Sequence, residues 1–123
     1  MMTALYLDEG GSVFTVDIGD DTLKGLQALV DGWVDCARTV DGTLDVWVND
    51  EGLYRSDFTV NLMASFLVGR TLVGPAVLAS LTMDGRTVGV DDKHVAALER
   101  QGMRIFDNDG APYTVAEILA MRE

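Results

Sequence analysis

The chain has 123 residues, one cysteine and a formal net charge of −11 at pH 7. This is the usual length of one domain, and a hydrophobic content of 48% is enough for a packed core, so the composition excludes a disordered chain. One cysteine excludes an intramolecular disulfide and a zinc site built from several cysteines. We expect a single domain over residues 1–123, in the cytoplasm, because the sequence shows no secretory signal and no membrane-spanning apolar run.

The chain begins with a predicted hairpin followed by a helix. Two β-prone runs, residues 3–8 and 12–18, flank a short turn that contains Gly10 and Gly11. Apolar residues then recur at helical spacing over residues 23–30, and Gly32 lies just beyond the end of that pattern. The candidate N-caps of this helix are Asp20, Asp21 and Thr22.

A second hairpin is predicted over residues 33–48. Its two runs flank Asp41 and Gly42, a pair that accepts the positive φ angles of a two-residue type I′ turn. With that turn the numbers of opposed residues sum to 83, which places Arg38 opposite Asp45 as an opposite-charge pair. A shift of one residue would mix the polar and apolar faces, so we expect this register.

The same pattern recurs around Asp84 and Gly85, between residues 76–83 and 86–90. A two-residue turn there makes opposed numbers sum to 169 and places Leu81 opposite Val88. The first of these strands is apolar on both faces, so it is either central in the sheet or part of a subunit interface. The sequence does not choose between them, and a homo-oligomer stays open.

Three further helices are each marked by a capping residue ahead of an apolar run. The caps are Asn61 before residues 62–68, the Asp91 and Asp92 pair before a helix ending near Gln101, and Thr114, which matches a capping box with Glu117. A short strand at residues 103–106 precedes the last helix. Together these elements predict an α+β fold, a mainly antiparallel sheet built from hairpins with three to four short helices.

No group of residues predicts catalysis, a metal site or a cofactor. His94, the only histidine, lies on a predicted helix, where a solvated side chain is the usual case. Cys36 lies in mid-strand beside Trp47, and we expect a structural thiol because no nearby cation would lower its pKa. Paired carboxylates such as Asp91 and Asp92 fall at predicted turns or helix starts, where they bind free N–H groups. We therefore expect a protein that is not an enzyme.

Acidic residues are concentrated in the first half of the chain. Residues 1–57 hold twelve acids and three bases, a net charge of −9, whereas residues 58–123 hold eight acids and six bases, a net charge of −2. A field of this sign repels nucleic-acid phosphates and suits a basic protein partner. The alternative is that the acids occupy solvated turns and only keep the domain soluble. We expect no direct contact with nucleic acid or a membrane.

Residues 26–35 and 48–54 resemble a phage-associated family of small uncharacterised domains. The family pattern is a leucine-rich helix, a hairpin and an Asn-acid-acid-Gly turn. It continues with an Asn that opens a helix containing Ala, here Asn61 and Ala64, and then an apolar strand ending in Val-Gly at Gly74. The resemblance extends over residues 22–80.

The chain departs from this family pattern at two positions. Asp31 stands where the family prefers Gly, and Leu62 stands where a Pro is common. The resemblance implies a phage or mobile-element origin and a domain of unknown function. It transfers no catalytic residue.

Three functions are open on this sequence. The first is a phage-type accessory protein, a non-enzymatic interaction module that binds a host protein through an acidic surface of its first half. On that surface we expect partner contacts from Asp50, Glu51, Tyr54 and Arg55, because Tyr and Arg are typical interface residues. The alternatives are an acidic DNA mimic that inhibits a restriction or other DNA-binding enzyme, and a small-ligand-binding protein.

Overall fold

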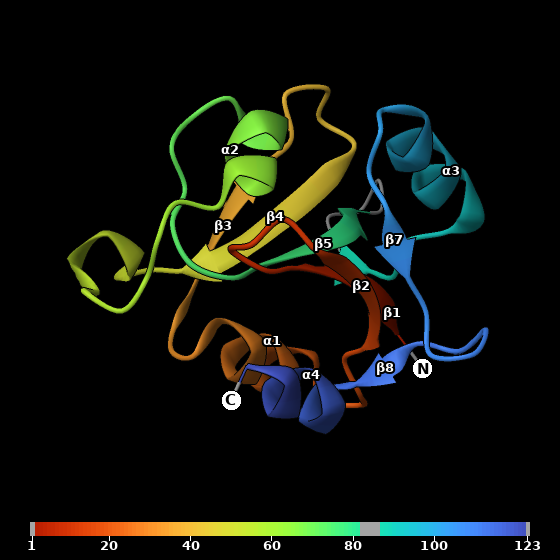
Figure 1. The fold of residues 1–123 in the computed structure, drawn as a ribbon, viewed down its shortest axis with the longest axis horizontal. Coiled ribbons are helices and arrows are strands. Elements are labelled where there is room, and N and C mark those ends of the chain that lie inside the picture. The colour runs from red at the N-terminus through yellow and green to blue at the C-terminus, as the bar shows by residue number, and fades with distance from the viewer. Residues whose placement is uncertain (1, 82–86, 123) are drawn as a thin grey trace.

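The structure is a computed structural model that describes residues 2–81 and 87–122, and it contains a mixed sheet with helices on both faces (Figure 1). The strands are β1 (Thr3–Leu7), β2 (Val13–Asp17), β3 (Val34–Arg38), β4 (Leu44–Asn49), β5 (Ala76–Leu81), β6 (Thr87–Val88), β7 (Ile105–Phe106) and β8 (Tyr113–Thr114). The helices are α1 (Thr22–Val30), the 3₁₀ turn η1 (Gly52–Tyr54), α2 (Leu62–Val68), α3 (Asp92–Arg100) and α4 (Val115–Met121). The α+β class is confirmed.

The strand order is β3-β4-β5-β1-β2-β7, with β6 paired to β5 and β8 paired to β2. Pairing is antiparallel except where β7 and β8 run parallel to β2, so the predicted mainly antiparallel sheet is confirmed. Strand β5 lies between β4 and β1. Its apolar character on both faces is therefore explained by a central position in the sheet.

Each face of the sheet is covered by two helices, so the molecule has two apolar cores. On one face α2 and α3 cover residues such as Leu7, Val46 and Leu78. On the other face α1 and α4 cover Tyr6 and Val77. None of the described helices is both long and apolar enough to cross a membrane.

The register of the β3–β4 hairpin is confirmed, but its turn was predicted wrongly. Ala37 pairs with Val46 and Arg38 with Asp45, as a sum of 83 requires. Asp41 does not take a positive φ, and Gly42 N donates to Thr39 O, so the loop is longer than two residues. The physical reason is a tertiary hydrogen bond, because Val40 N donates to Leu67 O of α2 and so leaves the hairpin ladder.

The register predicted for the β5–β6 hairpin is wrong by one residue. Ser80 pairs with Val88 and Leu81 with Thr87, so opposed numbers sum to 168 rather than 169. A two-residue turn cannot produce this sum, because an odd number of residues separates Leu81 from Thr87. The predicted turn at Asp84 and Gly85 lies outside the described residues.

The helix starts are the most accurate part of the sequence prediction. Of the three candidates, Asp21 is the N-cap of α1, and Asn61 and Asp91 cap α2 and α3. Thr114 and Glu117 form the expected capping box of α4. Asp31 takes a left-handed φ of 62° at the end of α1, the conformation for which the family pattern uses Gly.

Asn61 also joins three parts of the fold through a side chain that is fully buried. Its Nδ2 donates to Leu7 O at 3.1 Å and to Gly74 O at 2.9 Å, and its Oδ1 accepts from Ala64 N at 3.1 Å. One amide thus binds the end of β1, the residue two positions before β5, and the first turn of α2.

Replacing Asn61 by Ala is expected to lower the free energy of unfolding by about 2–4 kcal/mol, because two buried carbonyls and one helix N–H lose their partner. Urea denaturation followed by circular dichroism measures this value. The control is Asn108→Ala, because that exposed amide makes one surface bond to Glu117. The control is expected to change stability by less than about 0.5 kcal/mol. Equal effects of both substitutions would contradict a structural role for Asn61.

Candidate functional site

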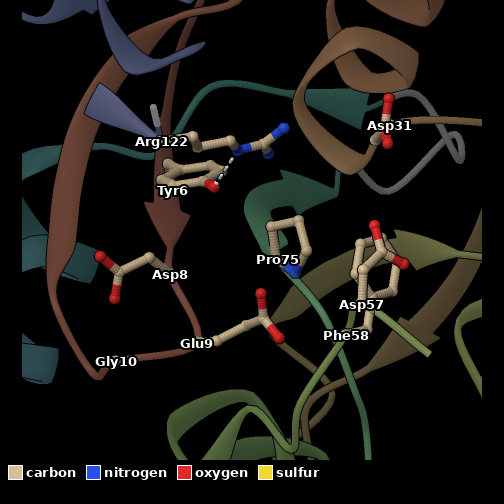
Figure 2. Close-up of a pocket in the computed structure, with 9 residues that line it drawn as sticks. All are labelled: Tyr6, Asp8, Glu9, Gly10, Asp31, Asp57, Phe58, Pro75 and Arg122. Carbon is tan, nitrogen blue, oxygen red and sulfur yellow. Dashed lines mark hydrogen bonds between the residues drawn. The ribbon is translucent and has the colours of Figure 1, made fainter. Parts of the chain in front are cut away.

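An open cleft of about 420 Å³ lies where segments from distant parts of the chain meet (Figure 2). The β1–β2 turn forms one wall, the loop between β4 and α2 forms a second, and the residue after α4 closes a third side. The lining residues are Tyr6, Asp8, Glu9, Gly10, Asp31, Asp57, Phe58, Pro75 and Arg122. Four of these side chains are carboxylates, and we refer to this hollow as the acidic cleft.

Tyr6 and Arg122 form the wall between β1 and α4. Arg122 Nε donates to the Tyr6 hydroxyl at 2.8 Å, and its guanidinium lies over the Tyr6 ring, 5.2 Å from the centroid, as Figure 2 shows. Burial raises the pKa of Tyr6, and the neighbouring Arg122 opposes part of that rise. The phenol therefore stays protonated at neutral pH and remains able to donate a hydrogen bond.

The β1–β2 turn holds two of the carboxylates. Asp8 Oδ1 accepts from Ser12 N at 2.8 Å, inside the turn. Glu9 reaches across to the β4–α2 loop, where its Oε2 accepts from Thr59 N and, at 2.8 Å, from Thr59 Oγ1. Figure 2 shows the Glu9 side chain extending from the turn toward the loop. Both carboxylates are thus positioned by uncharged donors.

The other two carboxylates share one cation. Arg55 Nη2 lies 2.8 Å from Asp31 Oδ2 and 2.7 Å from Asp57 Oδ2, and its guanidinium stacks on Phe58 at 4.3 Å. The hydrogen bond from Arg55 lowers the pKa of Asp57, so this carboxylate is charged at neutral pH. The cluster joins the end of α1 to the loop and orders that side of the cleft.

The structure separates the four residues predicted to contact a partner. Arg55 lies in the ion cluster just described. Asp50, Glu51 and Tyr54 are exposed at the start of the same loop and do not line the cleft, and Tyr54 is 89% exposed. Asp50 and Tyr54 line a smaller hollow of about 90 Å³ beside β3, together with Asp35 and Arg70.

Sequence reasoning missed most of the acidic cleft. Tyr6 and Arg122 are 116 positions apart in the chain, and no local pattern links them. Asp8 and Glu9 read as ordinary turn residues. The one usable signal was the excess of acidic residues in residues 1–57. It predicts a negatively charged surface but does not say where on the fold that surface lies.

The chemistry of the acidic cleft suits a cation carried on an apolar stem. Carboxylates surround the opening, while Phe58 and Pro75 provide apolar surface within it. The described residues contain no group of three or more His, Cys, Asp or Glu side chains arranged to hold a metal ion. The four carboxylates give the lining a negative charge, which favours a cationic group over an anion.

The two side chains weighed earlier for catalysis have structural surroundings. His94 accepts a hydrogen bond from Asp91 N through Nδ1 and donates its own backbone N–H to Asp91 Oδ1, which completes the capping box of α3. Cys36 pairs with Trp47 across the hairpin, as expected. Partial burial, and secondly the carboxylate of Asp45, raise the pKa of the Cys36 thiol to about 11.

Comparison with known proteins gives one match. The family model described as a domain of unknown function (DUF3846) matches residues 2–102, and the chain belongs to this family. No match is found among curated proteins or among solved structures. The expected resemblance to an uncharacterised domain family is thus confirmed, while its phage association stays a prediction. Arg122 lies outside the matched residues.

Cys36 is expected to react slowly with iodoacetamide. Since the thiolate is the reactive form, a pKa of about 11 instead of 9.0 leaves about a hundredfold fewer thiolates at pH 8. A more basic thiolate is also a stronger nucleophile, which offsets about tenfold of the lost rate. Alkylation should therefore be about tenfold slower than that of a cysteine in an unstructured peptide. Mass spectrometry of a time course measures the rate.

The matched variant for the Cys36 test is Asp45→Asn, which removes the neighbouring charge and should speed alkylation at pH 8. Rates for the wild-type chain and the free peptide that agree within twofold would contradict the raised pKa.

Proposed function

We propose that this member of the DUF3846 family is a non-enzymatic protein-interaction module that holds a basic segment of a partner protein in the acidic cleft. The observation that supports the proposal is the gathering of four carboxylates from three segments around one open hollow. For a phage-encoded accessory protein, the partner is a protein of the host cell. A basic partner also fits the charge of −9 on residues 1–57.

The ion pairs within the cleft leave part of its charge unbalanced. Arg55 is shared by Asp31 and Asp57, and Arg122 bonds to the Tyr6 hydroxyl, so four carboxylates face two guanidinium groups. Asp8 and Glu9 accept hydrogen bonds from uncharged groups in the described part of the chain. A cation from a partner would pair with these carboxylates and lose less hydration than in a closed site, because the cleft is open to solvent.

The shape of the cleft favours a long side chain over a compact ion. Lys and Arg carry their charge on apolar stems that pack on apolar surface while the head stays polar. Phe58 and Pro75 supply that surface. A volume of about 420 Å³ is within the usual range for a bound group larger than a single ion.

The loop between β4 and α2 extends the interaction surface beyond the cleft. Leu53 and Tyr54 are 76% and 89% exposed, and Asp50 and Glu51 lie beside them. Exposed aromatic side chains next to charges are frequent anchors in interfaces. In this proposal the residues expected from sequence serve as the rim, and the acidic cleft holds the basic side chain.

The double substitution Asp8→Asn and Glu9→Gln tests this function. It removes two charges from the cleft, while the amide oxygens can still accept from Ser12 and Thr59. The control variant, Asp20→Asn with Glu99→Gln, removes two exposed charges that do not line the cleft. Immobilised proteins are exposed to a nuclease-treated bacterial lysate, and retained proteins are quantified by mass spectrometry.

We expect one stoichiometric partner whose affinity falls about tenfold for the cleft variant and little for the control, because each exposed ion pair contributes about 0.2–1 kcal/mol. Equal retention by both variants would contradict binding in the cleft. If the retained protein is a DNA-binding enzyme, and added duplex DNA displaces it from the immobilised chain, the result would instead support the DNA-mimic alternative.

A further inference from the structure

Strand β3 forms one lateral edge of the sheet, since the strand order begins with β3 and β4. It has five residues, whereas β7 and β8 at the other edge have two residues each. Its burial pattern is mainly exposed, with only Ala37 buried. Among residues 2–81 and 87–122, β3 is thus the longest strand with an unpaired side.

Two hydrogen bonds show which backbone groups of β3 face β4. Thr39 N donates to Leu44 O at 3.0 Å, just after the strand, and Trp33 O accepts from Asp50 N at 2.9 Å, just before it. The two residues that bond to the β4 side, Trp33 and Thr39, both have odd numbers. In an antiparallel pair successive residues alternate between facing the partner strand and facing away. The odd-numbered residues of β3 therefore bond to β4.

The even-numbered residues direct their N–H and C=O groups away from the sheet. These residues are Val34, Cys36 and Arg38. The next even residue, Val40, lies beyond the strand, and its N–H donates to Leu67 O of α2 at 2.9 Å. The outward-facing side of this backbone can therefore form hydrogen bonds, and Val40 forms one with α2.

We infer that a basic, extended segment of the partner protein binds by adding to β3 as a further strand. This inference rests on the proposed function and specifies how the partner is held. Backbone hydrogen bonds to the even-numbered residues would supply affinity, and side chains at alternate positions would supply specificity.

Charge on this edge favours a basic segment. Asp35 is exposed on β3, and Asp50 and Glu51 are exposed where β4 ends. The positive charge of Arg38 is partly met by the buried Asp45 carboxylate at 3.5 Å. The hollow beside β3 is lined by one cation, Arg70, and by the two carboxylates of Asp35 and Asp50. The net charge of this edge is therefore negative.

A second copy of the chain is the less favourable occupant. Each copy carries a net charge of −11, so pairing two β3 edges would bring two strongly acidic molecules together. Like charges in an interface are costly, whereas Lys or Arg on an added strand beside Asp35 would form opposite-charge cross-strand pairs.

The probe for this inference is a capped eight-residue peptide of alternating Lys and Val, added to the full chain under reducing conditions. Amide hydrogen exchange, followed by nuclear magnetic resonance, reports each backbone group separately. We expect slower exchange at Val34, Cys36 and Arg38 when the peptide binds. Unchanged exchange at these three amides, with the peptide bound elsewhere, would overturn strand addition.

The substitution Cys36→Pro gives an independent test. It removes an N–H that points away from β4, which an edge strand tolerates, and leaves the β3–β4 ladder intact. We expect peptide affinity to fall about tenfold, because a backbone hydrogen bond is lost and the ring blocks its neighbours. The control is Cys36→Ala, which keeps the N–H and should bind like the wild-type chain. If the proline variant does not fold, the exchange experiment on the wild-type chain still decides.

The outcomes separate this inference from the proposed function. Peptide binding that is weakened by the Asp8→Asn and Glu9→Gln variant, without protection of the three β3 amides, supports the cleft and overturns strand addition. Protection of those amides, together with unchanged peptide affinity in the cleft variant, supports strand addition and overturns binding in the cleft. Protection that grows with protein concentration in the absence of peptide identifies a second copy as the occupant and overturns a basic partner. No binding of the peptide to the wild-type chain also overturns the inference.

Discussion

The buried side-chain amide of Asn61 is the interaction on which this fold most depends. It holds the end of β1 and the residue before Pro75, and it begins α2, so a single group connects two neighbouring strand segments to a helix. Gly74 takes a positive φ of 81° beside this amide, and the Phe58 ring lies so close that any Cβ there would be 2.6 Å from it. The apolar surface of the acidic cleft, Phe58 and Pro75, is thereby placed by a polar group with no exposed surface.

A second amide explains the other end of the same loop. Asn49 donates from Nδ2 to Val30 O at 3.1 Å and to Asp31 O at 3.0 Å, and its Oδ1 accepts from Glu51 N. Gly32 leaves room for this side chain, because a Cβ at Gly32 would lie 2.7 Å from Asn49 Nδ2. The most recognisable residues of the family pattern, Asn49 and Asn61, thus hold backbone segments in place. Their physical role is to position the loop between β4 and α2.

The acidic cleft and the β3 edge place interaction groups on neighbouring parts of the molecule. Asp31 contributes to the cleft at the end of α1, and β3 begins three residues later. Arg122 reaches the cleft from a segment beyond the family match, where it bonds to Tyr6 of β1. The family match over residues 2–102 therefore includes the acidic side of the cleft, while the Arg122 guanidinium comes from the residue after α4.

The sequence by itself determined features that depend on residues near one another in the chain, within one helical turn or within one hairpin. The caps Asn61, Asp91 and Thr114 were predicted correctly because an N-cap bonds to a backbone N–H in the first helical turn. The β3–β4 register was predicted correctly because one shift would expose its apolar face.

Only the tertiary structure decided the features that join distant segments. A bond from Val40 to Leu67 lengthened the predicted turn, and the pairing of Ser80 with Val88 shifted a predicted register. The cleft formed because folding brought Arg122 to Tyr6. Such contacts are set by how elements pack on the sheet, and a linear pattern carries no record of that packing.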